Sequence, residues 1–216
     1  IESVERLIFA GALQSWSAGR VQRALRGVKP VFGAAYIIPS VTGMKKLAGI
    51  CYILRPVWRA QQSGEFSQEL KIPLWAVEGG PHRRSLKRMH ERLMQFKHIG
   101  PFIAYEAVSD LRWTKILDTA VDIESWASPG PGCAKGLARV LQQPIGTFHY
   151  GAATSRAEML KPMADILVAS RDDKYWPRTW PGWEMREVEH NLCEWHKYEK
   201  AKEGLRLKQR YNGTGL

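Results

Sequence analysis

Cysteine is scarce in this chain. Three cysteines, Cys51, Cys133 and Cys193, occur among its 216 residues, and they lie far apart in the sequence. A small, odd set of cysteines argues against a disulfide scaffold and fits a reducing cytoplasm. Because a fourth cysteine is missing, the sequence also excludes an iron–sulfur cluster of the four-cysteine kind.

Long apolar runs are missing as well. No segment reaches the roughly 18–20 apolar residues that a membrane-spanning helix requires. The most apolar region, residues 31–54, is interrupted by Pro39, Gly43, Lys45 and Lys46. We recognise no secretory signal peptide, nucleotide-kinase phosphate loop, dinucleotide-binding fingerprint or serine-hydrolase elbow. The familiar catalytic motifs therefore do not account for the function of this chain.

Acidic residues are in the minority. The chain has 32 Lys and Arg against 21 Asp and Glu, which gives a net charge of +11 and a pI of about 9.7. This positive excess fits a polyanionic partner such as nucleic acid, although a basic enzyme without such a partner is the alternative. The hydrophobic content of 44% is enough for a full core.

The spacing of apolar residues predicts a mostly helical chain. We expect one all-α domain over residues 1–216, and we leave open whether an N-terminal segment has been lost. Residues 31–38 fit a buried strand or a helix equally well, and residues 72–77 fit a short strand or turn. The predicted helices cover residues 2–13, 18–25, 43–58, 85–97, 100–113, 156–170 and 183–202.

A glycine hairpin between helices is the most informative local pattern, over about residues 120–141. Gly130 and Gly132 allow backbone angles that other residues resist, and the amides that open the next helix form a phosphate-binding nest. Lys135 and Arg139 add positive charge to that helix. The pattern resembles the helix-hairpin-helix element of DNA glycosylases, which grips one DNA strand through its phosphates. An ordinary helix-loop-helix with a glycine C-cap is the alternative.

Two helices carry candidate catalytic side chains. Glu106 and Asp110 are four residues apart and therefore share a helix face. They could act as paired carboxylates in base catalysis, or each could form an ordinary ion pair with a nearby cation. On the last helix, His190, Glu194 and Lys197 form one stripe and Glu189, Cys193 and His196 form the next. Such a row suits proton transfer or anion binding, but it also suits a solvated, salt-bridged helix. We predict no metal site, because no second ligand cluster accompanies this helix.

Four sequence blocks together resemble one family: residues 31–38 (VFGAAYII), 100–112 (GPFIAYEAVSDLR), 129–137 (PGPGCAKGL) and 188–198 (VEHNLCEWHKY). They are similar to the glycosylase-related phage proteins known as α-glutamyl/putrescinyl thymine pyrophosphorylases or amino acid:DNA transferases. This family is also described as the helical domain found with 5-hydroxymethyluridine DNA kinases. The last block is the most specific, the hairpin block is shared with other DNA-binding proteins, and residues 1–29 match poorly.

The resemblance implies phage DNA hypermodification in the cytoplasm of an infected bacterium, with a DNA-glycosylase-like helical fold. A 5-hydroxymethyluridine DNA kinase would first make a pyrophosphate ester in DNA. The present enzyme would then displace pyrophosphate with an amine or amino acid, acting on a base that has left the stack. No cofactor is implied with certainty, and a divalent cation that assists pyrophosphate departure is left open.

The resemblance also implies roles for individual residues. Asp110 and Glu189 would act as base or bind the ammonium, with His190, Glu194 and Lys197 around the leaving group. The substrate would contact Tyr36, Tyr105, Glu106 and Arg112, and the DNA backbone would contact Gly130, Gly132, Lys135 and Arg139. Two rivals remain. A true DNA glycosylase would need an essential acid such as Asp165, and a non-catalytic DNA-binding module would need none of these acids.

Overall fold

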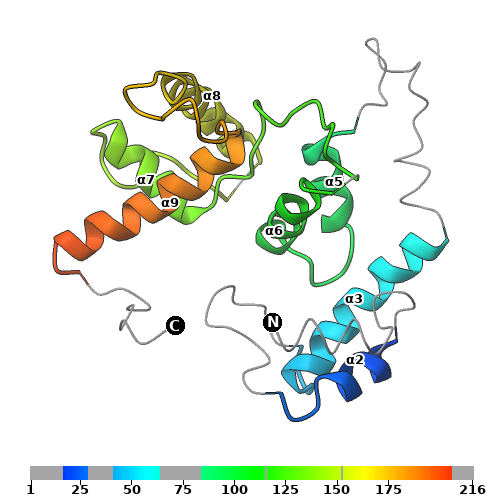
Figure 1. The fold of residues 1–216 in the computed structure, drawn as a ribbon. Helices are drawn as coiled ribbons and strands as arrows, with labels where there is room; N and C mark the ends of the chain where they lie inside the picture. Colours follow the sequence, from blue (N-terminus) through cyan, green and yellow to red (C-terminus); the bar gives the residue numbers. More distant parts are fainter. Residues whose placement is uncertain (1–16, 29–40, 64–83, 115, 152, 206–216) are drawn as a thin grey trace. The chain divides into compact units, whose positions relative to one another are not determined.

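The computed structural model describes residues 17–28, 41–63, 84–114, 116–151 and 153–205. Within these ranges the backbone forms α-helices joined by turns and contains no strand, so the predicted all-α class is confirmed (Figure 1). The predicted segments 2–13, 31–38 and 72–77 lie outside the described residues. The helices are α2 (Ala18–Ala24), α3 (Lys46–Gln62), α5 (Leu86–Met94), α6 (Pro101–Leu111), α7 (Pro131–Val140), α8 (Ala153–Ala169) and α9 (Met185–Lys202).

The chain divides into two compact units. The first comprises Ile1–Arg84 and Met89–Ala104, and the second comprises Ser85–Arg88 and Tyr105–Leu216. Helices α2 and α3 belong to the first unit, whereas α7, α8 and α9 belong to the second. That the two units act as one domain stays a prediction.

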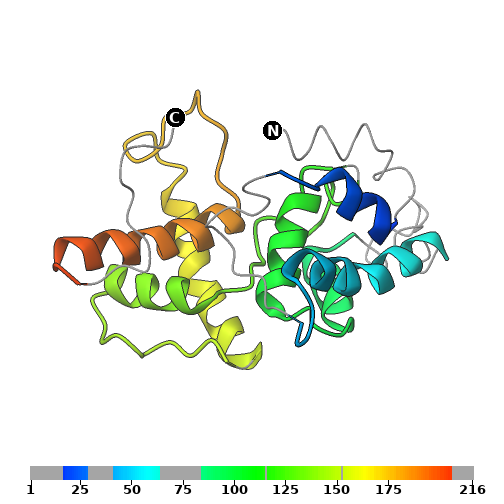
Figure 2. The ribbon, with the colours of Figure 1, turned by 90° about the horizontal axis from the view of Figure 1, so that it is seen from below.

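In the first unit, α2 packs along α3, and both views show the two helices side by side (Figures 1 and 2). Their contact is a small core of Val21, Leu25, Val28 and Cys51. Helix α3 continues through Pro56 to Gln62, four residues beyond the end predicted from the sequence. Proline lacks a backbone N–H, so α3 loses one intrahelical hydrogen bond at Pro56, but the helix does not end there.

The second unit is built around α7, α8 and α9 (Figure 2). Apolar side chains from all three helices form its core, including Leu137, Met159, Met163, Val188 and Leu192. Helix α8 begins at Ala153, three residues before the predicted start, and it contains Pro162. Helices α7 and α9 make the closest packing of the three.

The close packing of α7 on α9 depends on two glycines. A Cβ atom at Gly136 would lie 1.9 Å from the carbonyl oxygen of Leu192, and one at Gly132 would lie 2.3 Å from Cys193 Sγ. No side chain fits at Gly136 unless the helices move apart. The sequence-based explanation for these glycines is therefore wrong: Gly132 lies inside α7, and Gly130 has an ordinary extended backbone with φ −94° and ψ −178°.

The first helix of the predicted helix-hairpin-helix is not found. Residues 121–125 form turns, residues 126–130 are irregular, and α7 begins directly at Pro131. Asp122 uses its carboxylate instead to cap α5. It accepts hydrogen bonds from the backbone N–H groups of Leu86 and Lys87 at 2.7 and 3.0 Å, and from the Ser85 hydroxyl at 2.7 Å. This long-range cap has no signature in the local sequence.

Candidate active site

Glu189 is the buried acid of the second unit. It projects from α9, its side chain is 8% exposed, and its Oε1 accepts a hydrogen bond from the backbone N–H of Gly130 at 3.1 Å. Gly130 is the N-cap of α7, so the carboxylate lies at the positive end of that helix dipole. Burial raises the pKa of Glu189 above its usual value, while the Gly130 hydrogen bond and His190 oppose that rise. Glu189 is therefore a carboxyl group that holds a proton more tightly than an exposed one.

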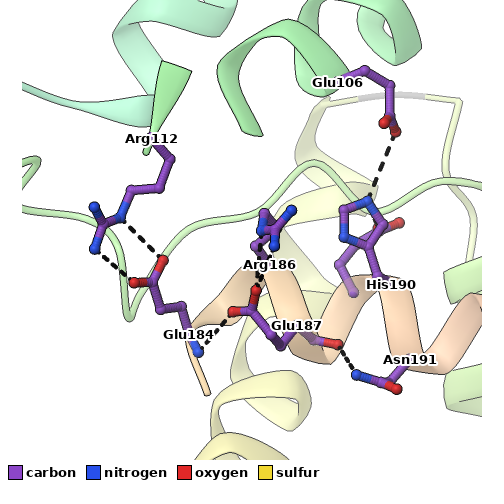
Figure 3. A network of polar contacts seen from close by, with 8 residues as sticks. Glu106, Arg112, Glu184, Arg186, Glu187, His190 and Asn191 are labelled. Carbon is purple, nitrogen blue, oxygen red and sulfur yellow. Dashed lines mark hydrogen bonds and ion pairs between the residues drawn. The ribbon is translucent and has the colours of Figure 1, made fainter. Parts of the chain in front are cut away.

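His190 lies between two carboxylates, one on α6 and one on α9. Its Nε2 is 3.8 Å from Glu106 Oε1 and 3.8 Å from Glu189 Oε2, and Figure 3 shows the Glu106 contact. At this separation the contacts are too long for hydrogen bonds, and they are ion pairs when His190 is protonated. Among the described residues, the buried Nε2 atom has no hydrogen-bond partner. Glu106 is the main cause that raises the pKa of His190, with Glu189 adding to it and burial opposing it.

Aromatic and sulfur groups line the buried side of this cluster. Tyr105 is 4% exposed, its ring lies 6.0 Å from that of His190, and it meets Trp126 edge-on at 5.8 Å. Burial, and then the charge of Glu189, raises the pKa of Tyr105, so its phenol stays neutral. The Cys133 thiol is buried nearby, and burial likewise raises its pKa. The cluster therefore has a low-dielectric side at Tyr105 and a solvent-facing side at His190, whose side chain is 35% exposed.

A second polar network fixes the start of α9 against the end of α6 (Figure 3). Arg112 forms a two-pronged pair with Glu184, at 2.6 and 3.1 Å, and both side chains are 15% exposed. The Glu187 carboxylate accepts from the Glu184 backbone N–H at 2.9 Å and pairs with Arg186 at 2.8 Å. The network holds in register the two helices that supply Glu106, Glu189 and His190.

The three groups at this site can bind a cation and move a proton. Two carboxylates and one imidazole give a net negative site whenever both acids are ionised, and an ammonium ion could donate hydrogen bonds to those carboxylates. Burial raises the pKa of Glu189, which makes this carboxylate a stronger proton acceptor than an exposed one. The geometry therefore suits a site that binds a cation and accepts a proton.

The structure brings together some of the predicted catalytic residues and separates others. Glu189 and His190 meet as predicted, with Glu106 as the facing carboxylate. Asp110, one turn further along α6, is exposed. Glu194 and Lys197 pair with each other at the surface, with side chains 67% and 55% exposed. The predicted stripe on α9 thus divides into a buried pair and a solvated pair, and catalytic roles for Asp110, Glu194 and Lys197 stay predictions.

The predicted DNA-binding residues have mixed environments. Lys135 is exposed on α7, whereas Gly130 already donates its N–H to Glu189 and Gly132 packs against Cys193. Arg139 binds Glu203 through both terminal nitrogens and donates from Nε to His196 Nδ1 at 3.2 Å. Their roles in phosphate binding stay predictions, and Lys135 has the environment that suits one best.

The sequence analysis did not identify Glu184 and Glu187, which support this site. Glu184 and Glu187 have the spacing of a capping box, which was the available signal for the start of α9. Arg112 pairs with Glu184, and its predicted role in substrate binding stays a prediction. Tyr36 lies outside the described residues. Among the residues that are described, no cluster of three or more His, Cys, Asp or Glu side chains is arranged to hold a metal ion.

The comparison with protein families agrees with the helical architecture. The sequence model of the family described as 5-hmdU DNA kinase, helical domain, matches residues 11–205. The chain belongs to this family. No curated protein and no solved structure matched the chain. The matched range includes Glu106, Glu189 and His190 together with the whole of α9.

No helix in the described ranges is long and apolar enough to cross a membrane.

Proposed function

We propose that this chain modifies thymine bases in DNA by transferring an amine to a pyrophosphorylated 5-hydroxymethyluracil, in a bacterium infected by a phage. The ammonium co-substrate loses a proton to the enzyme, and its nitrogen forms a bond to the 5-methylene carbon. The carbon–oxygen bond to pyrophosphate breaks, and pyrophosphate leaves with the bonding electrons. The products are an aminated thymine and free pyrophosphate.

The observation that carries this proposal is the Glu106–His190–Glu189 cluster. An incoming ammonium must lose a proton. Glu189 is buried and has a raised pKa, so it binds that proton more tightly than an exposed carboxylate would. His190 lies 3.8 Å from both acids and is partly exposed, which suits a group that passes the proton toward solvent. Glu106 would bind the cationic amine or stabilise the protonated imidazole.

The family and the charge of the chain support a DNA substrate. The family description names a DNA kinase for 5-hmdU, and this chain carries no nucleotide-kinase phosphate loop. In this proposal a 5-hmdU DNA kinase activity prepares the ester and this chain consumes it. The net charge of +11 favours binding of DNA, and exposed Lys135 would contact its phosphates.

A DNA-binding module without catalytic activity is the second candidate. One observation favours it: Glu189 accepts a hydrogen bond from the Gly130 N–H, and this bond links α9 to the N-cap of α7, as a purely structural residue would. A true glycosylase receives less support, because Asp165 pairs with Lys161 at 3.4 Å on the surface and its side chain is 68% exposed.

The test is a transfer assay on DNA that carries the pyrophosphorylated base. The protein is incubated with this DNA and one candidate amine at a time, such as glycine, glutamate or putrescine. Mass spectrometry of the nucleosides then detects the aminated base, and released pyrophosphate is measured in parallel.

Glu189→Gln should lower turnover by about 10²-fold or more, the usual scale for a general base. Glu158→Gln changes an exposed acid on α8 that has no role in the proposed reaction, so it is the matched control and should retain turnover. If no amine gives product while DNA binding persists, the binding-module candidate replaces the transferase.

A further inference from the structure

The first unit contains a basic pocket that the proposed active site does not use. It has a volume of about 390 Å³, and its lining comes from α3 and from the chain around the start of α2. The lining residues are Ser17, Ala18, Gly19, Arg55, Trp58 and Arg59. Pockets that bind small ligands or single nucleotides are of this size. The chemistry of the lining therefore decides what the pocket takes.

Two arginines and a tryptophan form one face of α3. Arg55, Trp58 and Arg59 are spaced i, i+3 and i+4, so their side chains leave the helix on the same side. Both arginines are exposed and Trp58 is half-buried. In the described part of the chain, neither guanidinium has a hydrogen bond or ion pair with an acid. Two like charges one turn apart repel each other, and an anion bound between them would remove that repulsion.

The sequence around this pocket has no acidic residue. From Leu7 to Gly64 there is no Asp or Glu, whereas the same stretch contains Arg20, Arg23, Arg26, Lys29, Lys45, Lys46, Arg55 and Arg59. In the second unit, two exposed arginines do pair with acids: Arg171 with Glu124 at 2.8 Å and Arg178 with Asp173 at 2.5 Å. Acids within the stretch from Leu7 to Gly64 therefore do not neutralise Arg55 and Arg59, and a bound polyanion would supply their counter-charge.

We propose that the Arg55–Trp58–Arg59 pocket binds an unpaired DNA strand, with its phosphates on the two guanidinium groups and a base against the Trp58 indole. Arginine matches phosphate in planar, two-pronged geometry, and aromatic side chains give unpaired bases a stacking surface that tolerates any sequence. A purely electrostatic patch would need no tryptophan, and a purely apolar pocket would not include two unpaired arginines. This inference extends the proposed DNA substrate to a second contact region in the first unit.

The test compares DNA binding by two double variants of the full chain. Arg55→Gln/Arg59→Gln removes both pocket charges, and Arg171→Gln/Arg178→Gln is the control because it changes the net charge equally. Fluorescence anisotropy with a labelled single-stranded oligonucleotide, measured from 50 to 300 mM salt, gives affinity and salt slope. The pocket variant should bind about tenfold more weakly at low salt, with a slope smaller by about 1.4, or 0.7 for each lost phosphate contact. The control should keep the slope of the unmodified protein.

The tryptophan has its own test. Trp58→Phe preserves an aromatic surface and should retain most of the affinity for single-stranded DNA, whereas Trp58→Leu should lose about tenfold. The loss should be smaller for a fully paired duplex, in which no base is free to stack. Thermal unfolding of each variant checks that the α2–α3 core persists, and the arginine variants keep the proposal testable if Trp58→Leu does not fold.

Three results would overturn the proposal: an unchanged salt slope in the pocket variant, an equal loss in the control variant, or displacement of the oligonucleotide by micromolar thymidine monophosphate. The last result would assign the pocket to a free nucleotide. These measurements need no turnover, so they stand apart from the transferase. Failure of Glu189→Gln to lower turnover would remove the proposed reaction and leave the binding result intact.

Discussion

The backbone N–H of Gly130 donates a hydrogen bond to Glu189 Oε1 at 3.1 Å. The amide at the N-cap of α7 is therefore occupied by an anion of the protein itself, where the sequence predicts a DNA phosphate. A carboxylate at this position is stabilised by the helix dipole and repels a second anion. The same contact gives Glu189 a fixed position 3.8 Å from His190. The N-cap of α7 thus holds the buried acid in place.

The pH dependence of stability should reveal the two raised pKa values. Both Glu189 and His190 have folded-state pKa values above their ordinary values of 4.5 and 6.5, so the folded protein binds these protons more tightly than the unfolded chain. Their contribution is therefore fully present below the ordinary pKa and is lost as pH rises through the raised one. The unfolding free energy of wild type minus that of Glu189→Gln should fall as pH rises above 4.5. Urea titrations at a series of pH values measure this difference, and a flat difference would contradict the raised pKa of Glu189.

Gly136 of α7 and its N-cap Gly130 should differ in how much stability a substitution by alanine removes. Gly136→Ala places a Cβ atom 1.9 Å from the Leu192 carbonyl oxygen and should lower the unfolding free energy by at least about 2 kcal/mol. Gly130→Ala meets its nearest neighbour, Glu189 Oε1, at 3.8 Å with φ at −94°, so the change should stay below about 1 kcal/mol. Denaturant unfolding of the two variants checks both values. Equal losses of unfolding free energy would mean that the close packing of α7 on α9 is not the reason for glycine at position 136.

The sequence predicts what depends on local spacing. Apolar periodicity places α6 and α9 within a few residues of their observed bounds, with Glu106 and Asp110 on one helix and Glu189 and His190 on the other. It does not show that Glu106, rather than Asp110, faces His190, because residues four apart share a helix face and only packing decides which turn meets α9. The Gly-x-x-x-Gly spacing of Gly132 and Gly136 was visible, but its meaning depends on Leu192 and Cys193, more than fifty residues away.

The ion pair between Arg112 and Glu184 should be worth more than a surface pair. Both side chains are 15% exposed and the contact is two-pronged, so a double-mutant cycle with Arg112→Gln and Glu184→Gln should give a coupling of about 1–2 kcal/mol. The exposed pair of Lys161 and Asp165 is the matched comparison, and its coupling should stay below about 0.5 kcal/mol. Similar couplings in the two cycles would show that the Arg112 network does not fix α9.

Turnover should distinguish the two carboxylates of α6. Glu106 lies 3.8 Å from His190, whereas Asp110 is exposed one turn later. If the cluster carries the reaction, Glu106→Gln should reduce turnover by about 10²-fold and should also lower the pKa of His190, because its main raising influence is removed. Asp110→Asn tests the sequence-based prediction in the same assay. A large loss in Asp110→Asn alone would move the reaction to the exposed end of the helix.

DNA binding through α7 should depend on Lys135 more than on Arg139. Lys135 is exposed, whereas the guanidinium of Arg139 is already held by Glu203 and His196, so a phosphate would have to compete for it. Lys135→Gln should weaken binding to any DNA sequence and reduce the salt slope by about 0.9 on duplex DNA, the value for one phosphate contact. Arg139→Gln should change the slope by less, and Lys161→Gln, an exposed lysine of the same unit, serves as the control for net charge. The slopes come from anisotropy titrations over a range of salt concentrations. An unchanged slope in a folded Lys135→Gln protein would remove α7 from the DNA interface and leave phosphate binding to other basic surfaces of the chain.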